Sequence, residues 1–143
     1  MRFLPSAALS GQRTSSLLAV AVLDASALIA LLNQEPGAER VRDVLAESMV
    51  SAVNCAEVYS KLSDWNVAFA SFDDLISVVP TVVGFDLGLA RRAGELSAAT
   101  RHLGLSLGDR ACLALAEREG LPALTADRKW ARLEIGIAVE LIR

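Results

Sequence analysis

The sequence predicts an α/β fold built around a central, mainly parallel sheet. Short apolar runs typical of buried strands alternate along the chain with longer segments that are amphipathic or rich in Ala and Leu, as helices are. The chain has 143 residues, of which 53% are hydrophobic, so it can form one domain with a sizeable core. The same composition excludes a disordered chain, which would be poorer in apolar residues.

A strand and two helices are expected first. The apolar run Leu18–Leu23 carries Val at alternate positions and predicts a buried strand. Ala25–Leu32 is rich in Ala and Leu and predicts a helix, and Pro36, in a first-turn position, opens a second one. The run Met49–Val53 is again short and apolar, and it predicts the second strand.

Two further helices and a strand are expected in the middle of the chain. Asn54 can cap a helix over residues 54–62. Apolar side chains at helical spacing predict another helix over Trp65–Ser77. The Val-rich run Val78–Val83 predicts a strand, and Pro80 indicates a bend at its boundary.

The remainder of the chain is expected to add two helices and two strands. The first helix, Asp86–Thr100, has an acid in the capping position, and the second, Asp109–Glu119, is followed at once by Gly120, a common helix stop. The apolar runs Ala123–Thr125 and Ile135–Ile142 predict the last two strands. In such alternating folds, ligands bind outside the carboxyl ends of the strands.

Residues 1–18 are expected to form a flexible leader, because they mix Pro, Ser, Gly and Arg without a period. A basic start followed by an apolar stretch is also a feature of signal peptides. The apolar stretch Leu17–Leu32 is, however, interrupted by Asp24 and is shorter than the ~20 residues that a bilayer span needs. We therefore expect no membrane segment, and a single domain over residues 19–143.

The composition also limits the chemistry. The only histidine, His102, argues against a metal cage built from histidines, and two distant cysteines, Cys55 and Cys112, cannot form a four-thiolate zinc site. Free buried thiols are typical of a reducing compartment, which favours a cytoplasmic location. The net charge of −3 argues against simple electrostatic binding of nucleic acid. Carboxylates are the main polar groups that remain.

Four acidic residues stand at junctions where a strand or loop leads into a helix. They are Asp24, Glu57, Asp109 and Asp127. Each can also be a simple helix cap, and both Asn54-x-x-Glu57 and Ser106-x-x-Asp109 resemble capping boxes. A purely structural role for each acid therefore stays open.

Asp24 is the acid that a structural role explains least well. It lies in the most apolar stretch of the chain, with no Lys or His within ten residues on either side. An unpaired buried carboxylate is costly, so it raises its pKa or binds a cation. If the four acids converge, they need a multivalent cation to stay ionised, and Mg²⁺ and Mn²⁺ prefer such oxygen ligands. This arrangement suits the hydrolysis of a phosphodiester.

The chain resembles the PIN-domain nucleases, and more closely the VapC-type toxins of bacterial toxin–antitoxin pairs, in the segments VLDASALIALL, SAVNCAEV and GLSLGDRACLALAEREGLPALTADRKW. The resemblance covers about residues 20–143, and it implies a PIN-like three-layer α/β/α sandwich. The acidic metal site of the family maps onto the four acids Asp24, Glu57, Asp109 and Asp127. Its supporting polar residues map onto Ser26, Asn54 and Thr125.

The resemblance also implies an activity and partners. It implies an endoribonuclease that needs Mg²⁺ or Mn²⁺ and hydrolyses RNA, often tRNA or rRNA, with a metal-activated water. It further implies a small antitoxin that blocks the site, and a homodimer. Arg110 and Arg128 adjoin the acids and are candidates for RNA contacts, because the guanidinium fork matches phosphate geometry. Without the four acids, basic residues outnumber acidic ones, so the net charge no longer argues against RNA.

Two alternatives remain. A phosphatase of the haloacid dehalogenase type also has a first strand that ends in Asp, but its chemistry needs a second Asp two residues later, where this chain has Ser26. A PIN-like domain can also act only as a binding module or scaffold. Such degenerate relatives normally lose acids, whereas this chain keeps all four.

Overall fold

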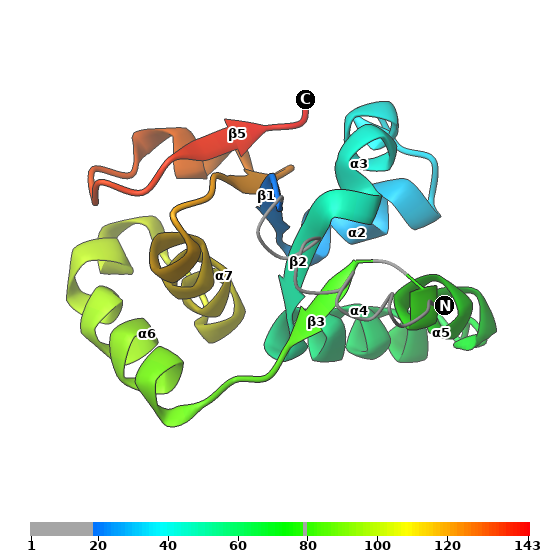
Figure 1. Ribbon diagram of the computed structural model, residues 1–143, viewed down its shortest axis with the longest axis horizontal. Helices are drawn as coiled ribbons and strands as arrows, with labels where there is room; N and C mark the ends of the chain where they lie inside the picture. The colour runs from blue at the N-terminus through cyan, green and yellow to red at the C-terminus, as the bar shows by residue number, and fades with distance from the viewer. Residues whose placement is uncertain (1–18, 79) are drawn as a thin grey trace, which may run out of the picture.

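The computed structural model describes residues 19–78 and 80–143. Its sheet has five parallel strands in the order β3-β2-β1-β4-β5, which confirms the predicted α/β fold (Figure 1). The strands are β1 (Ala21–Leu23), β2 (Ser48–Ser51), β3 (Thr81–Val83), β4 (Ala123–Thr125) and β5 (Val139–Leu141). The predicted leader over residues 1–18 lies outside the described residues.

Six α-helices and three short 3₁₀ helices connect the strands within the described ranges. The α-helices are α2 (Ala25–Leu32), α3 (Ala38–Val44), α4 (Ala52–Asp64), α5 (Ala70–Val78), α6 (Leu87–Thr100) and α7 (Leu107–Glu119). The 3₁₀ helices are η1 (Leu45–Glu47), η2 (Arg101–Leu103) and η3 (Arg128–Arg132). None of the helices in the described part of the chain is both long and apolar enough to cross a membrane.

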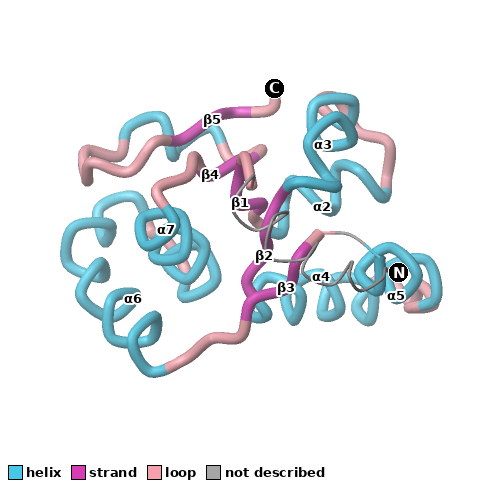
Figure 2. Tube along the Cα trace, viewed as in Figure 1, coloured by secondary structure: helices cyan, strands magenta, loops and turns pink. Residues whose placement is uncertain are grey.

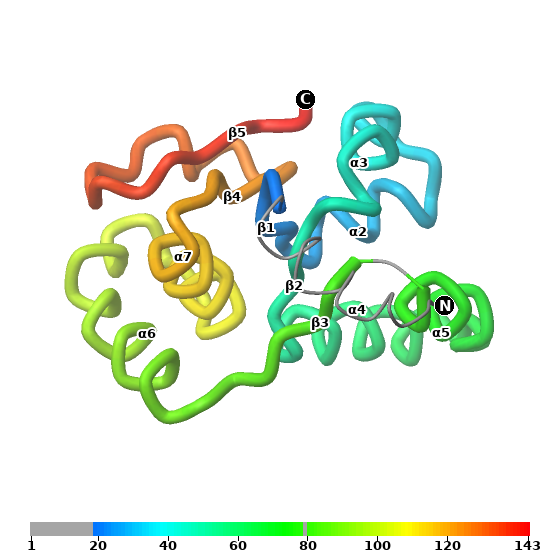
Figure 3. The backbone as a smooth tube through the Cα atoms, in the orientation of Figure 1, coloured from blue at the N-terminus to red at the C-terminus, as the bar shows by residue number. Residues whose placement is uncertain are grey.

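The sheet lies between two helical layers. In the register of the sheet, Val22 of β1 stands opposite Met49 of β2 and Ala123 of β4, and all three face the core formed with α6 and α7. The next residue along, Leu23, stands opposite Leu124 and packs into a second core with α2, α3, α4 and α5. Strand side chains alternate between faces, so one buried strand supplies both cores. Figure 3 shows β1 in the middle of the sheet, between β2 and β4.

The predicted caps are largely confirmed. Asp24 caps α2, Asp86 caps α6, Ser106 and Asp109 form a capping box on α7, and Asp127 caps η3. Gly120 ends α7 in the left-handed conformation, as expected for a helix stop. These interactions are local, so a capping residue just before a helical pattern is enough to place them.

The prediction that Asn54 caps a helix is wrong. Ser51, at the end of β2, caps α4 and accepts a hydrogen bond of 3.1 Å from the backbone N–H of Val53. The helix therefore begins before Asn54, which lies inside its first turn and is fully buried. The N-x-x-E pattern there is not a capping box.

Other predicted boundaries shift. Pro36 precedes α3, whose N-cap is Gly37 with a φ of 95°. Residues 65–69 are not helical, because α4 continues to Asp64 and Asn66 then adopts a left-handed φ of 62°. The strand predicted over Ala123–Thr125 is confirmed at both ends, whereas the other four differ at their boundaries. β2 begins and ends earlier than predicted, and residues 135–138 form a loop instead of the start of the last strand (Figure 2).

Candidate metal centre

Asp24 lies at the end of β1, with 3% of its surface exposed. Its Oδ1 accepts hydrogen bonds from the hydroxyl of Ser26 (2.6 Å) and from the backbone N–H of Ala27 (3.0 Å). Its Oδ2 accepts one from the hydroxyl of Thr125 (2.8 Å). Burial raises the pKa of Asp24 to about 6, although these hydrogen bonds oppose the shift; the negative charge of Asp109 adds to it.

Two hydroxyls join the end of β1 to the end of β4. The Oγ of Ser26 lies 3.2 Å from the Oγ1 of Thr125 and accepts a hydrogen bond from the backbone N–H of Ala126 (2.8 Å). Thr125 also accepts one from the backbone N–H of Asp127 (3.0 Å). Ser26 and Thr125 thus hold the Asp24 carboxylate and the backbone that leads to Asp127 in one network.

Glu57 extends from α4 and is partly buried. The side-chain amide of Asn54 donates to Glu57 Oε1 (2.7 Å) and to the carbonyl oxygen of Gly108 in α7 (3.0 Å). The pKa of Glu57 is raised, mainly by burial and further by the charge of Asp109. The hydrogen bond from Asn54 and the charge of Lys61 oppose this shift. The Oδ1 of Asn54 is a buried acceptor without a hydrogen-bond partner among the described residues.

Asp109 occupies the first turn of α7. Its Oδ2 accepts a hydrogen bond from the backbone N–H of Ser106 (2.9 Å), while its own N–H donates to the Ser106 hydroxyl (3.2 Å). Cys112 lies one turn further along α7 and is fully buried. Burial raises the pKa of its thiol, and the charges of Asp24, Asp109 and Glu57 raise it further. Three of the four predicted acids therefore lie within electrostatic reach of one turn of α7.

Asp127 is placed differently. Its Oδ1 accepts from the backbone N–H of Lys129 (3.2 Å), and its Oδ2 forms an ion pair with the ammonium group of Lys129 (3.8 Å). Its charge is not among those that shift the pKa of Asp24 or Glu57. The link between Asp127 and the other acids runs through Thr125.

The donor atoms suit a hard divalent cation, because Mg²⁺ and Mn²⁺ prefer oxygen ligands. Asp109 repels both Asp24 and Glu57, and a cation would relieve that repulsion. Within the described ranges, however, no three His, Cys, Asp or Glu side chains are grouped closely enough to hold an ion. The residues fit Mg²⁺ or Mn²⁺ in donor type and in charge, without forming a ready-made ligand set.

The two arginines predicted to contact RNA both have protein partners. Arg110 is partly buried and donates to the carbonyl oxygen of Ala93 in α6 (2.8 Å). Arg128 is exposed and donates to the carbonyl oxygen of Arg143 (2.9 Å). Contact with RNA stays a prediction for both.

Sequence reasoning did not single out Gly108, which adjoins the Glu57 carboxylate. A glycine in the first turn of a helix, directly before an acid, was the available signal.

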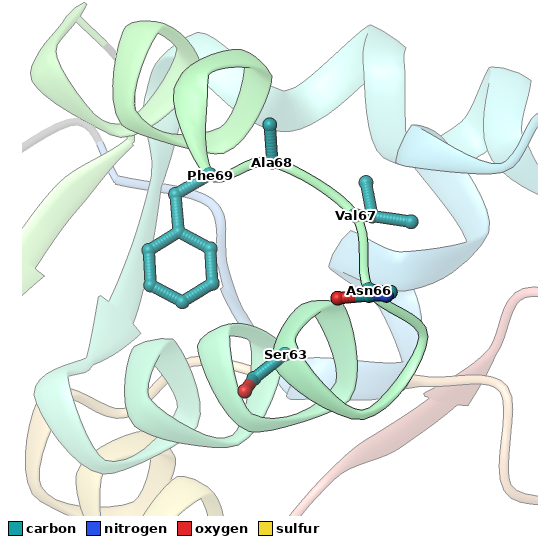
Figure 4. A pocket seen from close by; sticks show the side chains of 5 residues that line it. All are labelled: Ser63, Asn66, Val67, Ala68 and Phe69. Carbon is teal, nitrogen blue, oxygen red and sulfur yellow. The ribbon is translucent and has the colours of Figure 1, made fainter.

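A separate cavity of about 460 Å³ lies where α4 connects to α5, and Figure 4 shows the five side chains that line it. They are Ser63, Asn66, Val67, Ala68 and Phe69, so none of the predicted site residues belongs to this cavity.

A family model described as PIN domain matches residues 21–136 of the chain. No curated protein matches its sequence significantly. The fold is similar to that of a toxin–antitoxin complex from Klebsiella pneumoniae, with a TM-score of 0.67 and 19% identity over 86% of this chain and 98% of the other.

Two further solved structures are similar. In a DNA-bound VapBC complex from Salmonella typhimurium, the matching chain has a TM-score of 0.67 and 21% identity, over 87% of this chain and 99% of that one. The third is VapC20 from Mycobacterium tuberculosis, a toxin that cleaves the sarcin–ricin loop, with a TM-score of 0.66 and 20% identity over 80% and 96% of the two chains. At these identities the likeness shows a shared fold.

Proposed function

The chain belongs to the PIN-domain family, and from that premise we propose that it is a Mg²⁺- or Mn²⁺-dependent endoribonuclease, the toxin of a toxin–antitoxin pair. One observation carries the proposal: the carboxylates of Asp24, Glu57 and Asp109 come from three separate segments, the charge of Asp109 acts on the other two, and all three charges act on Cys112. No cation is among the described groups that shift the pKa of Asp24. Acids gathered in this way are unfavourable unless a cation joins them.

The ion would be held by Asp24, Glu57 and Asp109, with Asp127 as the fourth acid. When bound, it would offset charge on the scissile phosphate and make a water more acidic. Attack by water would leave a 5′-phosphate and a 3′-hydroxyl. VapC20 supports RNA as the substrate class, because that similar protein cleaves the sarcin–ricin loop.

The supporting residues orient the acids. Ser26 and Thr125 leave the Asp24 carboxylate little rotational freedom, because each donates to a different oxygen. Asn54 fixes one oxygen of Glu57 in the same way. Arg128, exposed beside Asp127, is the arginine better placed to contact an RNA phosphate, because Arg110 is partly buried against α6.

The proposal is tested by assaying cleavage of structured RNA with Mn²⁺ for wild type, Asp24→Asn and Asp109→Asn. We expect both variants to lose activity by about 100-fold or more. Asp86→Asn is the matched control, because Asp86 also caps a helix through its carboxylate but lies outside the cluster. Cleavage at the wild-type rate by Asp24→Asn or Asp109→Asn would exclude this mechanism.

We also propose an antitoxin partner and a homodimer. The similar structures from Klebsiella pneumoniae and Salmonella typhimurium support the antitoxin, because each is a toxin–antitoxin complex. Light scattering on the purified chain would show its oligomeric state. Co-expression with the product of a short adjacent gene, followed by the RNA assay, would show whether that product blocks cleavage.

A scaffold without catalytic activity is the second candidate. The observation that favours it is that, among the described residues, the acids do not form a ready-made ligand set. Titration calorimetry separates the two functions, because a scaffold would bind no Mn²⁺. The phosphatase alternative is not supported, since the required second acid is replaced by Ser26, which donates to Asp24.

A further inference from the structure

We propose that Gly108 is a positioning residue for Glu57: because position 108 has no side chain, the Glu57 carboxylate can lie against α7 beside Asp109. This inference rests on the proposed metal centre, because it assigns a role to a residue that would not itself bind the ion. It concerns how close the carboxylate of Glu57 lies to Asp109.

The steric relationship is direct. A Cβ atom built on Gly108 would lie 2.2 Å from the Cδ and Oε2 of Glu57 and 2.3 Å from its Oε1. Real Cβ atoms essentially never have contacts below 3.0 Å, so any residue other than glycine would displace this carboxylate. Gly108 is buried and immediately precedes Asp109, so its backbone and that acid move together.

A second contact holds the same carboxylate. The buried amide of Asn54 donates both to Glu57 Oε1 (2.7 Å) and to the carbonyl oxygen of Gly108 (3.0 Å). The Glu57 carboxylate therefore contacts both a hydrogen-bond donor on its own helix and the first turn of α7 at Gly108. Both contacts fix the Glu57 carboxylate relative to the first turn of α7, which also carries Asp109.

The backbone does not explain the glycine. Gly108 lies inside an α-helix, where alanine is the more favourable residue. Gly94, inside α6, shows the difference, because a Cβ atom there would meet no atom of the described residues within 4 Å. At position 108 the three atoms nearest to such a Cβ all belong to Glu57, so this side chain is what requires glycine there.

Gly108→Ala is expected to fold, because the atoms that must give way are the end of a flexible side chain. The displaced carboxylate would lose the donor on Asn54 and its fixed position beside Asp109. Loss of a residue that orients a metal ligand typically lowers metal affinity about 10–100-fold. The effect should therefore appear in cation binding, without any RNA present.

The experiment is titration calorimetry with Mn²⁺ on the full chain, together with thermal unfolding in EDTA to confirm folding. Gly108→Ala should raise the Kd for Mn²⁺ by about 10–100-fold. The matched control Gly94→Ala should leave it unchanged. In a Glu57→Asp background, Gly108→Ala should raise the Kd for Mn²⁺ little further, because the shorter side chain does not reach the new Cβ atom. This non-additivity of the two substitutions distinguishes positioning of Glu57 from general destabilisation.

The outcomes separate the two proposals. If wild type binds Mn²⁺ and Gly108→Ala binds it equally well, the inference about Gly108 is wrong while the metal centre stands. Equal losses from Gly108→Ala in the wild-type and Glu57→Asp backgrounds would also overturn it. A wild-type protein without affinity for Mn²⁺ would overturn both this inference and the proposed metal-dependent function.

Discussion

Thr125 donates its hydroxyl proton to the Oδ2 of Asp24 over 2.8 Å, across 101 positions of the chain. Both residues are buried, and β4, which ends in Thr125, lies directly beside β1 in the sheet. The same Thr125 oxygen accepts the backbone N–H of Asp127. The hydroxyl of Thr125 therefore orients the carboxylate of Asp24 and also holds the backbone of Asp127.

Thr125→Val should destabilise the protein by about 1–3 kcal/mol, because it leaves one oxygen of a buried carboxylate without its donor. It should also weaken Mn²⁺ binding. Thr100→Val is the matched control: Thr100 is equally buried, but its hydroxyl donates to the carbonyl oxygen of Leu96 within α6. Chemical denaturation and titration calorimetry check both effects, and equal Mn²⁺ affinities in the two variants would contradict the role of Thr125.

Stability should depend on pH through Asp24, whose pKa rises from 3.8 to about 6 on burial. Between pH 4 and 6 the native state keeps a proton that the unfolded state has released. The free energy of unfolding should therefore fall by roughly 3 kcal/mol as the pH rises through this range, and the loss should persist above it. The measurement is denaturant unfolding in EDTA across pH 4 to 8.

Asp24→Asn isolates this contribution, since other groups titrate in the same range. The variant should match wild type near pH 4 and be more stable by roughly 3 kcal/mol at pH 8. If the stability difference between the two proteins stays constant with pH, Asp24 does not carry the raised pKa.

Much of the fold could be predicted, because its signals are local or periodic. Apolar runs identified all five strands, and Asp24 and Asp86 were expected at helix N-caps, where each bonds a backbone N–H three residues on. The start of α4 was misplaced because Ser51 and Asn54 are both capable caps. The end of β2 decides between them, and tertiary pairing of the strand sets that end.

The candidate site could be predicted in part for a similar reason. Asp24 stands at the end of a parallel strand, where a ligand site is expected, and the charge of Asp109 acts on it. Asp109 itself follows a connection between two helices, so its place depends on the packing of α7 against β1 and not on a strand end. The contact between Gly108 and Glu57 could not be predicted, because it depends on how closely α4 and α7 pack. The ion pair of Asp127 with Lys129 likewise depends on the turn geometry of η3.

Gly37 should be the glycine at which substitution costs most outside the site. It has a φ of 95°, and a Cβ atom there would lie 2.5 Å from the backbone oxygen of Ile142, which cannot move aside as a side chain can. We expect Gly37→Ala to cost about 2–5 kcal/mol in unfolding free energy. At Gly136, φ is 75° and a new Cβ would meet no atom of the part of the chain that the structure describes within 4 Å. Gly136→Ala should therefore show the cost of the backbone conformation alone, about 1–2 kcal/mol. Equal losses of unfolding free energy in the two variants would mean that the backbone of Ile142 leaves room for a Cβ atom at position 37.

Arg128→Ala should weaken RNA binding without changing cation binding. The side chain is exposed next to Asp127, and among the described residues it makes one hydrogen bond, to the carbonyl oxygen of Arg143, so it can turn toward a phosphate at little cost. Loss of one such contact should reduce RNA affinity several-fold and reduce its dependence on salt. Arg91→Ala is the control, because Arg91 is an equally charged, exposed residue on α6 that pairs with Glu95. The measurements are fluorescence anisotropy with labelled RNA at several salt concentrations and calorimetry with Mn²⁺. Equal RNA affinities of the two variants would contradict the role of Arg128.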